Sequence, residues 1–71
     1  MRKNLKNARI KKEVTVAEIA TLANISSSFY YKIESGLRNP TMNLAKKISD
    51  ILGKDINYLF FNDALDEMSK N

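Results

Sequence analysis

Hydroxyl, phenol and ammonium groups recur at helical spacing between residues 27 and 35. At about 100° per residue, one side of a helix, which we call the polar side, carries Ser27, Ser28, Tyr31, Lys32 and Ser35. Serine hydroxyls can donate to or accept from several base edges, and a lysine can reach O6 and N7 of guanine. The phenol can bind a phosphate or lie against a sugar. This side of the helix therefore carries the kinds of groups that hydrogen bonding to duplex DNA requires.

The opposite side of the same predicted helix is mainly apolar. Tyr30, Ile33, Glu34 and Leu37 share it, and we expect them to face the core. Phe29 lies between the two sides, where it can pack inward or touch a thymine methyl group. The alternative for the polar side is ordinary solvated surface, in which the leading serines only start the helix and the lysine is only hydrated.

The chain contains no histidine and no cysteine, which removes most catalytic chemistry. The commonest general base, the thiol nucleophile and most zinc sites are excluded together. We therefore expect no enzymatic activity and no cofactor. The acidic residues Asp63, Asp66 and Glu67 could hold a divalent cation, but a solvated acidic surface is the favoured interpretation.

The net charge of +4 conceals an asymmetry along the chain. Residues 1–47 carry ten Lys and Arg against three Glu, whereas residues 48–71 carry two Lys against five acidic residues. The positive field is therefore confined to the first two thirds, as a phosphate-facing surface requires. Basic clusters are also common on solvated surfaces, so charge alone does not distinguish a DNA-binding surface from an ordinary solvated one.

At 71 residues the chain makes one domain, near the size at which a single hydrophobic core is marginal. Association into a dimer would supply the missing stability. No apolar run is long enough to span a bilayer, and the basic start is not followed by the apolar region of a signal peptide. We therefore expect a cytoplasmic protein with no membrane partner and no room for a small-molecule effector domain.

Cap residues and hydrophobic periods predict five helices and no strand, so the expected fold class is all-α. The first helix should run from about Arg2 to Lys12. An N-cap residue begins each of the next four helices, and a glutamate three residues after the first of these caps completes a capping box. These residues are Thr15 with Glu18, then Ser26, Thr41 and Asp55. The second, third and fourth helices should end near Ala23, Gly36 and Gly53.

The second and third predicted helices have the spacing of a helix-turn-helix. Apolar residues fall where the two helices would cross, Ala20 is small enough for close approach, and Asn24 suits a left-handed corner. The crossing positions are Ile19, Ala20, Ala23, Ile25 and Ile33. Such a unit presents its second helix to a major groove.

The assembled pattern resembles the phage-repressor family of helix-turn-helix domains, the Xre or Cro/CI type, over about residues 5–60. The resemblance implies a compact five-helix, lambda-repressor-like DNA-binding domain over residues 1–61, followed by an acidic tail at residues 62–71. The segments that carry it are Leu5 with Arg9, Thr15–Ala20, Ile25–Ser26, Lys32–Gly36, Arg38–Pro40, Leu52–Gly53, and Ile56 with Leu59 and Phe60.

The resemblance also implies roles for individual residues. Arg9 would pair with Glu34 in a structural ion pair that does not contact DNA. Ser27, Ser28 and Lys32 match the positions that read bases in the family. The helical projection adds Tyr31 and Phe29 to this predicted base-reading set. The positions expected to bind phosphates are Thr15, Val16, Ser35, Arg38 and Asn39.

Three departures from the family pattern bear on these roles. Val16 stands where a glutamine often binds phosphate, so the second helix would offer only its backbone N–H groups there. Ser27 and Ser28 replace longer side chains, which would reduce direct readout at this end. Phe29 and Tyr30 replace smaller residues, so the third helix would sit slightly farther from the second or reach DNA through an aromatic edge.

The end of the chain offers apolar side chains for a dimer. We assign Phe60, Phe61, Leu65 and Met68 to a self-complementary interface, although Phe60 also lies on the expected inner side of the fifth helix. The acidic residues around them would keep this end away from DNA. The alternative is a tail whose apolar residues fold back onto their own domain.

The favoured function is a sequence-specific transcriptional regulator, a repressor that binds double-stranded DNA at an inverted-repeat (palindromic) operator as a homodimer. An antitoxin or a restriction-modification controller with autoregulatory DNA binding would show the same pattern. A protein-binding module that recognises an acidic protein is the alternative outside DNA binding. A membrane-surface helix built from residues 1–12, with Leu5, Ala8 and Ile10 as its apolar face, is a further alternative.

Overall fold

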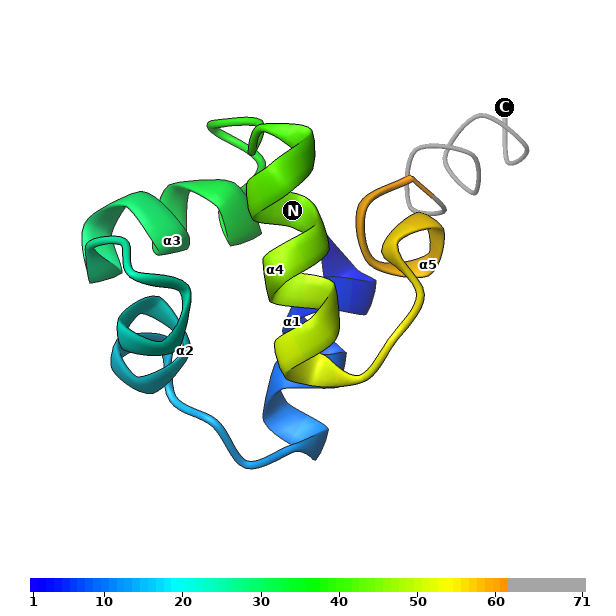
Figure 1. Ribbon diagram of the computed structural model, residues 1–71, viewed down its shortest axis with the longest axis horizontal. Coiled ribbons are helices and arrows are strands. Elements are labelled where there is room, and N and C mark those ends of the chain that lie inside the picture. Colours follow the sequence, from blue (N-terminus) through cyan, green and yellow to red (C-terminus); the bar gives the residue numbers. More distant parts are fainter. Residues whose placement is uncertain (62–71) are drawn as a thin grey trace.

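Five helices follow one another through residues 1–61, the part of the chain that the computed structural model describes (Figure 1). No strand occurs in this part, so the prediction of an all-α, five-helix domain is confirmed. The helices are α1 (Lys3–Lys11), α2 (Val16–Ala23), α3 (Ser27–Ser35), α4 (Met42–Leu52) and α5 (Ile56–Phe60). The acidic tail, with the assigned interface residues Leu65 and Met68 and the candidate cation ligands Asp63, Asp66 and Glu67, lies outside the described residues.

The predicted N-caps begin four of the helices. Thr15 Oγ1 accepts a hydrogen bond from the Glu18 backbone N–H at 3.0 Å, and the Glu18 carboxylate accepts one from the Thr15 N–H at 2.9 Å. Ser26, Thr41 and Asp55 likewise accept backbone N–H bonds in the first turns of α3, α4 and α5. These bonds satisfy N–H groups that a helix leaves unpaired, so local sequence sets the helix starts. α1 has no side-chain cap and is one residue shorter at each end than predicted.

Asn24 forms the corner between α2 and α3. Its φ of 60° and ψ of 43° lie in the left-handed region, which asparagine tolerates better than most residues. The turn is closed by a hydrogen bond of 2.9 Å from the Ile25 N–H to the Ala20 carbonyl. Ala20 is 1% exposed and Ile33 is fully buried, so the two helices pack closely behind the corner. The helix-turn-helix predicted from the sequence is therefore present.

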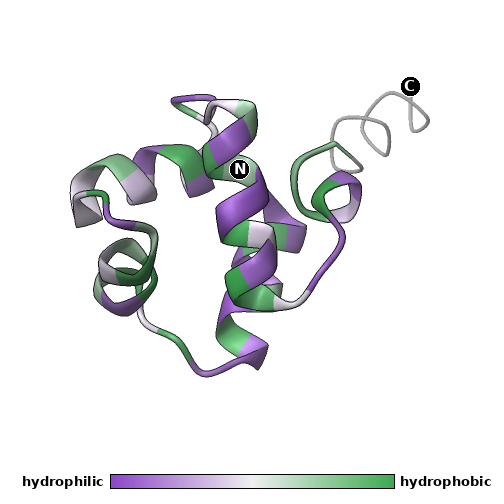
Figure 2. Cartoon of the chain, viewed as in Figure 1, coloured by the Kyte–Doolittle hydropathy of each residue, from purple (hydrophilic) through white to green (hydrophobic). Residues whose placement is uncertain are grey.

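α4 lies at the centre of the arrangement. It packs against α2 on one side and α5 on the other, while α1 packs against α5 and α3 (Figure 1). Figure 2 shows hydrophilic and hydrophobic residues alternating along α4, as expected of an amphipathic helix with one face in the core. The largest fully buried side chains are Tyr30, Leu5, Ile19, Ile33, Ile48 and Leu59.

Leu37 does not face the core, so its assignment to the inner side of the third helix is wrong. α3 ends at Ser35, and Gly36 takes a left-handed φ of 88° as its C-cap. The chain therefore leaves the helical path before Leu37, whose side chain is 72% exposed.

α1 contributes its apolar residues to the core. Leu5 is fully buried and Ala8 is 6% exposed, whereas Ile10 is 52% exposed. The alternative of a membrane-surface helix is therefore wrong, because two of its three apolar residues already pack within the domain. Within residues 1–61, no helix combines the length and the apolarity that crossing a membrane requires.

Candidate nucleic-acid interface

The polar side of α3 is exposed along its N-terminal half. Ser27, Ser28, Tyr31 and Lys32 are all exposed, and their side chains form no hydrogen bond or ion pair within residues 1–61. Ser26, which precedes them, is occupied as the N-cap, its Oγ accepting from the Phe29 N–H at 3.0 Å. Four adjacent side chains are thus held on a rigid helix with their donors and acceptors unused.

Two further residues of the predicted site are half-buried. Phe29 packs against the core, which favours packing inward over contact with a thymine methyl group. Only part of its ring remains accessible. The Ser35 hydroxyl donates to the Lys32 carbonyl at 3.2 Å, in the last turn of α3. Both therefore contribute less free polar surface than the four exposed residues of the polar side.

The start of α2 offers backbone groups rather than side chains. Val16 is half-buried and packs against the core, so its side chain has no polar contact to offer. The N–H groups of the first turn that the cap does not use project from the helix end, where the helix dipole favours an anion. The hydrogen bonds from the Thr15 backbone N–H and hydroxyl hold the pKa of Glu18 below its usual range. Glu18 therefore stays ionised as part of the capping box.

The loop between α3 and α4 carries the remaining phosphate candidates. Arg38 and Asn39 are exposed, and the Arg38 guanidinium has no partner within residues 1–61. The backbone N–H groups of Leu37 and Arg38 both donate to the Lys32 carbonyl, at 2.8 and 3.1 Å. The loop is thereby folded back onto the end of α3.

Arg2 also binds this loop, a role that the sequence did not predict. Its Nη1 donates to the carbonyls of Ile33 at 2.6 Å and Arg38 at 3.2 Å, and its Nη2 donates to Asn39 Oδ1 at 2.7 Å. The guanidinium carbon lies 5.8 Å from the centroid of the Phe60 ring. These partners are 31 to 58 positions away in the sequence, so no local pattern could have indicated them.

Arg9 and Glu34 join α1 to α3 through a bidentate ion pair. Arg9 Nε and Nη2 donate to the two carboxylate oxygens of Glu34 at 2.9 and 3.0 Å, and Arg9 Nη1 donates to the Val14 carbonyl at 2.9 Å. The hydrogen bonds and charge of Glu34 raise the pKa of Arg9. The pair lies under α3, away from the exposed polar side, which agrees with the structural role implied by the family resemblance.

Tyr30 completes the same buried network. Its hydroxyl donates to Glu34 Oε2 at 2.7 Å, and burial, supported by this hydrogen bond, raises the pKa of the phenol well above its usual range. No buried side-chain nitrogen or oxygen atom in the described part lacks a hydrogen bond. The sequence placed Tyr30 in the core but did not predict this contact, although its spacing of four residues from Glu34 was compatible with one.

Phe60 belongs to the core of the domain, so its assignment to a dimer interface is corrected. It is 8% exposed and packs within the buried cluster, because α5 turns it inward together with Leu59. Phe61, the next residue, is 42% exposed. Among the described residues, only Phe61 therefore remains from the predicted apolar interface.

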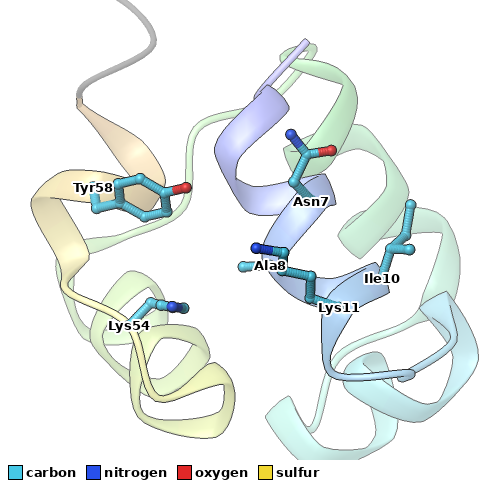
Figure 3. Close-up of a pocket in the computed structure, with 6 residues that line it drawn as sticks. All are labelled: Asn7, Ala8, Ile10, Lys11, Lys54 and Tyr58. Carbon is cyan, nitrogen blue, oxygen red and sulfur yellow. The ribbon is translucent and has the colours of Figure 1, made fainter.

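A cleft between α1 and α5 lies outside the predicted DNA-binding residues (Figure 3). None of its lining residues comes from α2, α3 or the loop that follows α3. In Figure 3, Tyr58 and Lys54 lie across the cleft from the residues of α1. The lining residues are Asn7, Ala8, Ile10, Lys11, Lys54 and Tyr58. Its lysines provide matched controls for substitutions on the polar side of α3.

Comparison with known proteins agrees with this geometry. The helix-turn-helix family model matches residues 5–59. A protein of Bacillus subtilis (strain 168), described as an uncharacterized HTH-type transcriptional regulator, YqaF, is 41% identical over 71 residues, which cover all of this chain and 92% of that protein. No solved structure matches the chain. The protein therefore belongs to the Xre-type helix-turn-helix family of DNA-binding transcriptional regulators.

Proposed function

We propose that this protein is a transcriptional repressor that binds an inverted-repeat operator as a homodimer, with α3 in the major groove. The observation that carries the proposal is the exposed polar side of α3, where Ser27, Ser28, Tyr31 and Lys32 have no partner within residues 1–61. In a helix-turn-helix, the N-terminal residues of the second helix contact base edges. The two serines and Lys32 supply donors and acceptors at this position.

Phosphate contacts would flank the base-reading residues and set the orientation of α3. On one side, the first turn of α2 provides backbone N–H groups near Val16. On the other, Arg38 and Asn39 project from the loop after α3. Because such contacts carry no sequence information, they would position the domain while the polar side of α3 selects the sequence.

The proposed dimer would use Phe61 together with Leu65 and Met68. Phe61 is 42% exposed at the end of α5, a larger exposure than a phenylalanine of the core would have. A twofold arrangement would place the two α3 helices in successive major grooves, about 34–36 Å apart. The operator would then be an inverted repeat.

Selection of bound sequences from a random duplex library, at about physiological salt, tests recognition. We expect an enriched inverted repeat from the native protein and the loss of one base preference per half-site from Lys32→Ala. Lys11→Ala removes the same charge from the α1–α5 cleft and should leave the selected sequence unchanged. No enrichment, or an enriched sequence that Lys32→Ala does not alter, would overturn the assignment of the polar side.

Sedimentation equilibrium tests the dimer separately from DNA binding. Phe61→Asp should shift the protein toward monomer, since it places a charge in the proposed apolar interface. Leu22→Asp is the matched control, because Leu22 is 59% exposed on α2 and lies outside that interface. A native protein that stays monomeric at all concentrations, or an equal effect of both substitutions, would contradict the interface.

Transcription in vitro tests the direction of control. A promoter overlapped by the selected inverted repeat should be silenced as protein is added, because the bound dimer would exclude the polymerase. Lys32→Ala should require a higher concentration for the same effect. Increased transcription from this template would overturn the repressor role while leaving operator binding intact.

A further inference from the structure

The side chain of Arg2 organises the loop that carries the proposed phosphate contacts. A guanidinium has only donors, and Arg2 directs them at the Ile33 carbonyl, the Arg38 carbonyl and Asn39 Oδ1. The Arg2 backbone N–H also donates to the Glu34 carbonyl at 2.8 Å. Arg2 thus bonds to the last turn of α3 and to the following loop, and so ties the two together.

The contact with Arg2 determines which way the Asn39 amide points. Because the guanidinium cannot accept a hydrogen bond, the atom that faces it at 2.7 Å has to be the amide oxygen. The amide nitrogen, Nδ2, therefore points away from Arg2. Asn39 is exposed, so Nδ2 presents two N–H donors at the surface of the loop. Phosphate oxygens are acceptors that such a group can bind.

The backbone of Arg38 is held by hydrogen bonds at both its N–H and its carbonyl. Its N–H donates to the Lys32 carbonyl at 3.1 Å, and its carbonyl accepts from Arg2 at 3.2 Å. Both main-chain groups are thereby engaged on the protein side of the loop. The Arg38 guanidinium remains exposed and without a partner in the described part of the chain.

We propose that Arg2 is a positioning residue for phosphate binding, which holds Asn39 and Arg38 so that their side-chain donors converge on one phosphate of the DNA backbone. The proposal rests on the DNA-binding function proposed above. Arg2 itself is only half-exposed, and its donors already serve protein acceptors beside the Phe60 ring. Its contribution to DNA binding is therefore transmitted through the loop.

A double-substitution cycle on the selected duplex tests this transmission. Arg2→Ala and Asn39→Ala should each weaken binding about tenfold. Arg2→Ala should also lower the slope of log K against log salt by about 0.9, because the Arg38 guanidinium then loses its phosphate, whereas removal of the neutral Asn39 amide should leave the slope unchanged. The double variant should bind no more weakly than Arg2→Ala, because the loss of Arg2 already removes the contact made by Asn39. Additive losses would overturn the proposal.

Arg2→Lys separates positioning from charge. A lysine keeps the positive charge but cannot make the forked contact with the Arg38 carbonyl and Asn39 together. We expect Arg2→Lys to bind DNA about as weakly as Arg2→Ala, with the same reduced salt slope. Full recovery of affinity by lysine would overturn the proposal in favour of a general electrostatic effect.

Asn4→Ala is the structural control. Asn4 Nδ2 donates to the Tyr58 carbonyl at 3.0 Å and so ties the same end of α1 to α5, away from the loop. This variant should lose thermal stability and keep both the affinity and the salt slope of the native protein. If native protein binds no duplex, the DNA-binding function fails. A second outcome is that the native protein binds and that Arg2→Ala, once circular dichroism shows it to be folded, binds with the native affinity and salt slope. In that case only the positioning role fails.

Discussion

The Tyr30 hydroxyl and the Glu34 carboxylate, one helical turn apart on α3, share a hydrogen bond of 2.7 Å inside the core. The same carboxylate receives two hydrogen bonds from Arg9 of α1. Glu34 is only 4% exposed, so its charge is compensated entirely by protein groups. The buried carboxylate therefore joins the inner side of α3 to α1, opposite the exposed polar side.

Tyr30→Phe should lower the free energy of unfolding by about 1–1.5 kcal/mol, because one buried donor to Glu34 is lost while the ring still fills the core. Urea unfolding followed by circular dichroism measures the change. Tyr31→Phe is the matched control, since the Tyr31 side chain is exposed and makes no hydrogen bond in residues 1–61. A control variant that is destabilised as much as Tyr30→Phe would contradict this account.

Alkaline pH should destabilise the native protein partly through Tyr30. The raised pKa of its phenol means that the folded state holds this proton more tightly than the unfolded state does. The stabilisation is complete below the unfolded value of 10.0 and is lost as pH rises beyond it toward the folded pKa. Urea unfolding at about pH 8 and about pH 11 should therefore show a smaller loss of stability for Tyr30→Phe than for the native protein. Equal losses would contradict the prediction.

Arg9→Met should be far more damaging, since it leaves the buried Glu34 carboxylate without its cation. The expected loss is about 3–5 kcal/mol, a large part of the total stability of a small domain. The double variant Arg9→Met, Glu34→Leu removes the stranded charge as well and should recover most of the loss. Thermal unfolding compares the two variants, and a double variant no more stable than Arg9→Met would show that the pair contributes mainly through packing.

Asn24→Val should destabilise the helix-turn-helix corner by about 1–2 kcal/mol, because a β-branched residue is strained in the left-handed conformation. Asn24→Gly, which fits the same φ and ψ without strain, should change the stability by less than about 0.5 kcal/mol. Differential scanning calorimetry distinguishes these outcomes. Similar losses in both variants would indicate that the Asn24 side chain, rather than its backbone conformation, stabilises the turn.

The features that the sequence predicted correctly depend on neighbouring residues. The caps at Thr15, Ser26, Thr41 and Asp55 act within one helical turn, so short spacings locate the helix starts well. The corner at Asn24 is equally local. The family resemblance supplied the pairing of Arg9 with Glu34, which spans 25 positions and which no helical period could predict.

The errors arose where the chain changes direction. The period of α3, extended past Gly36, predicts an inward Leu37, but the helix has already ended there and Leu37 is exposed. Phe60 and Phe61 are adjacent apolar residues, and only the packing of α5 decides that the first is buried and the second exposed. Arg2 has its partners 31 to 58 positions away, so its role depends on the tertiary fold.

Because Arg9 of α1 is bonded to Glu34 of α3, the helix-turn-helix cannot be moved to another protein by itself with its native contacts intact. A graft of residues 15–35 into another scaffold would carry the polar side of α3 with it but leave behind Arg9, whose guanidinium pairs with the buried Glu34 of that helix. It would also leave behind Arg2, which holds the end of the helix and the following loop. Engineering a new specificity into this domain therefore calls for substitutions on α3 within the intact chain, with the first helix retained.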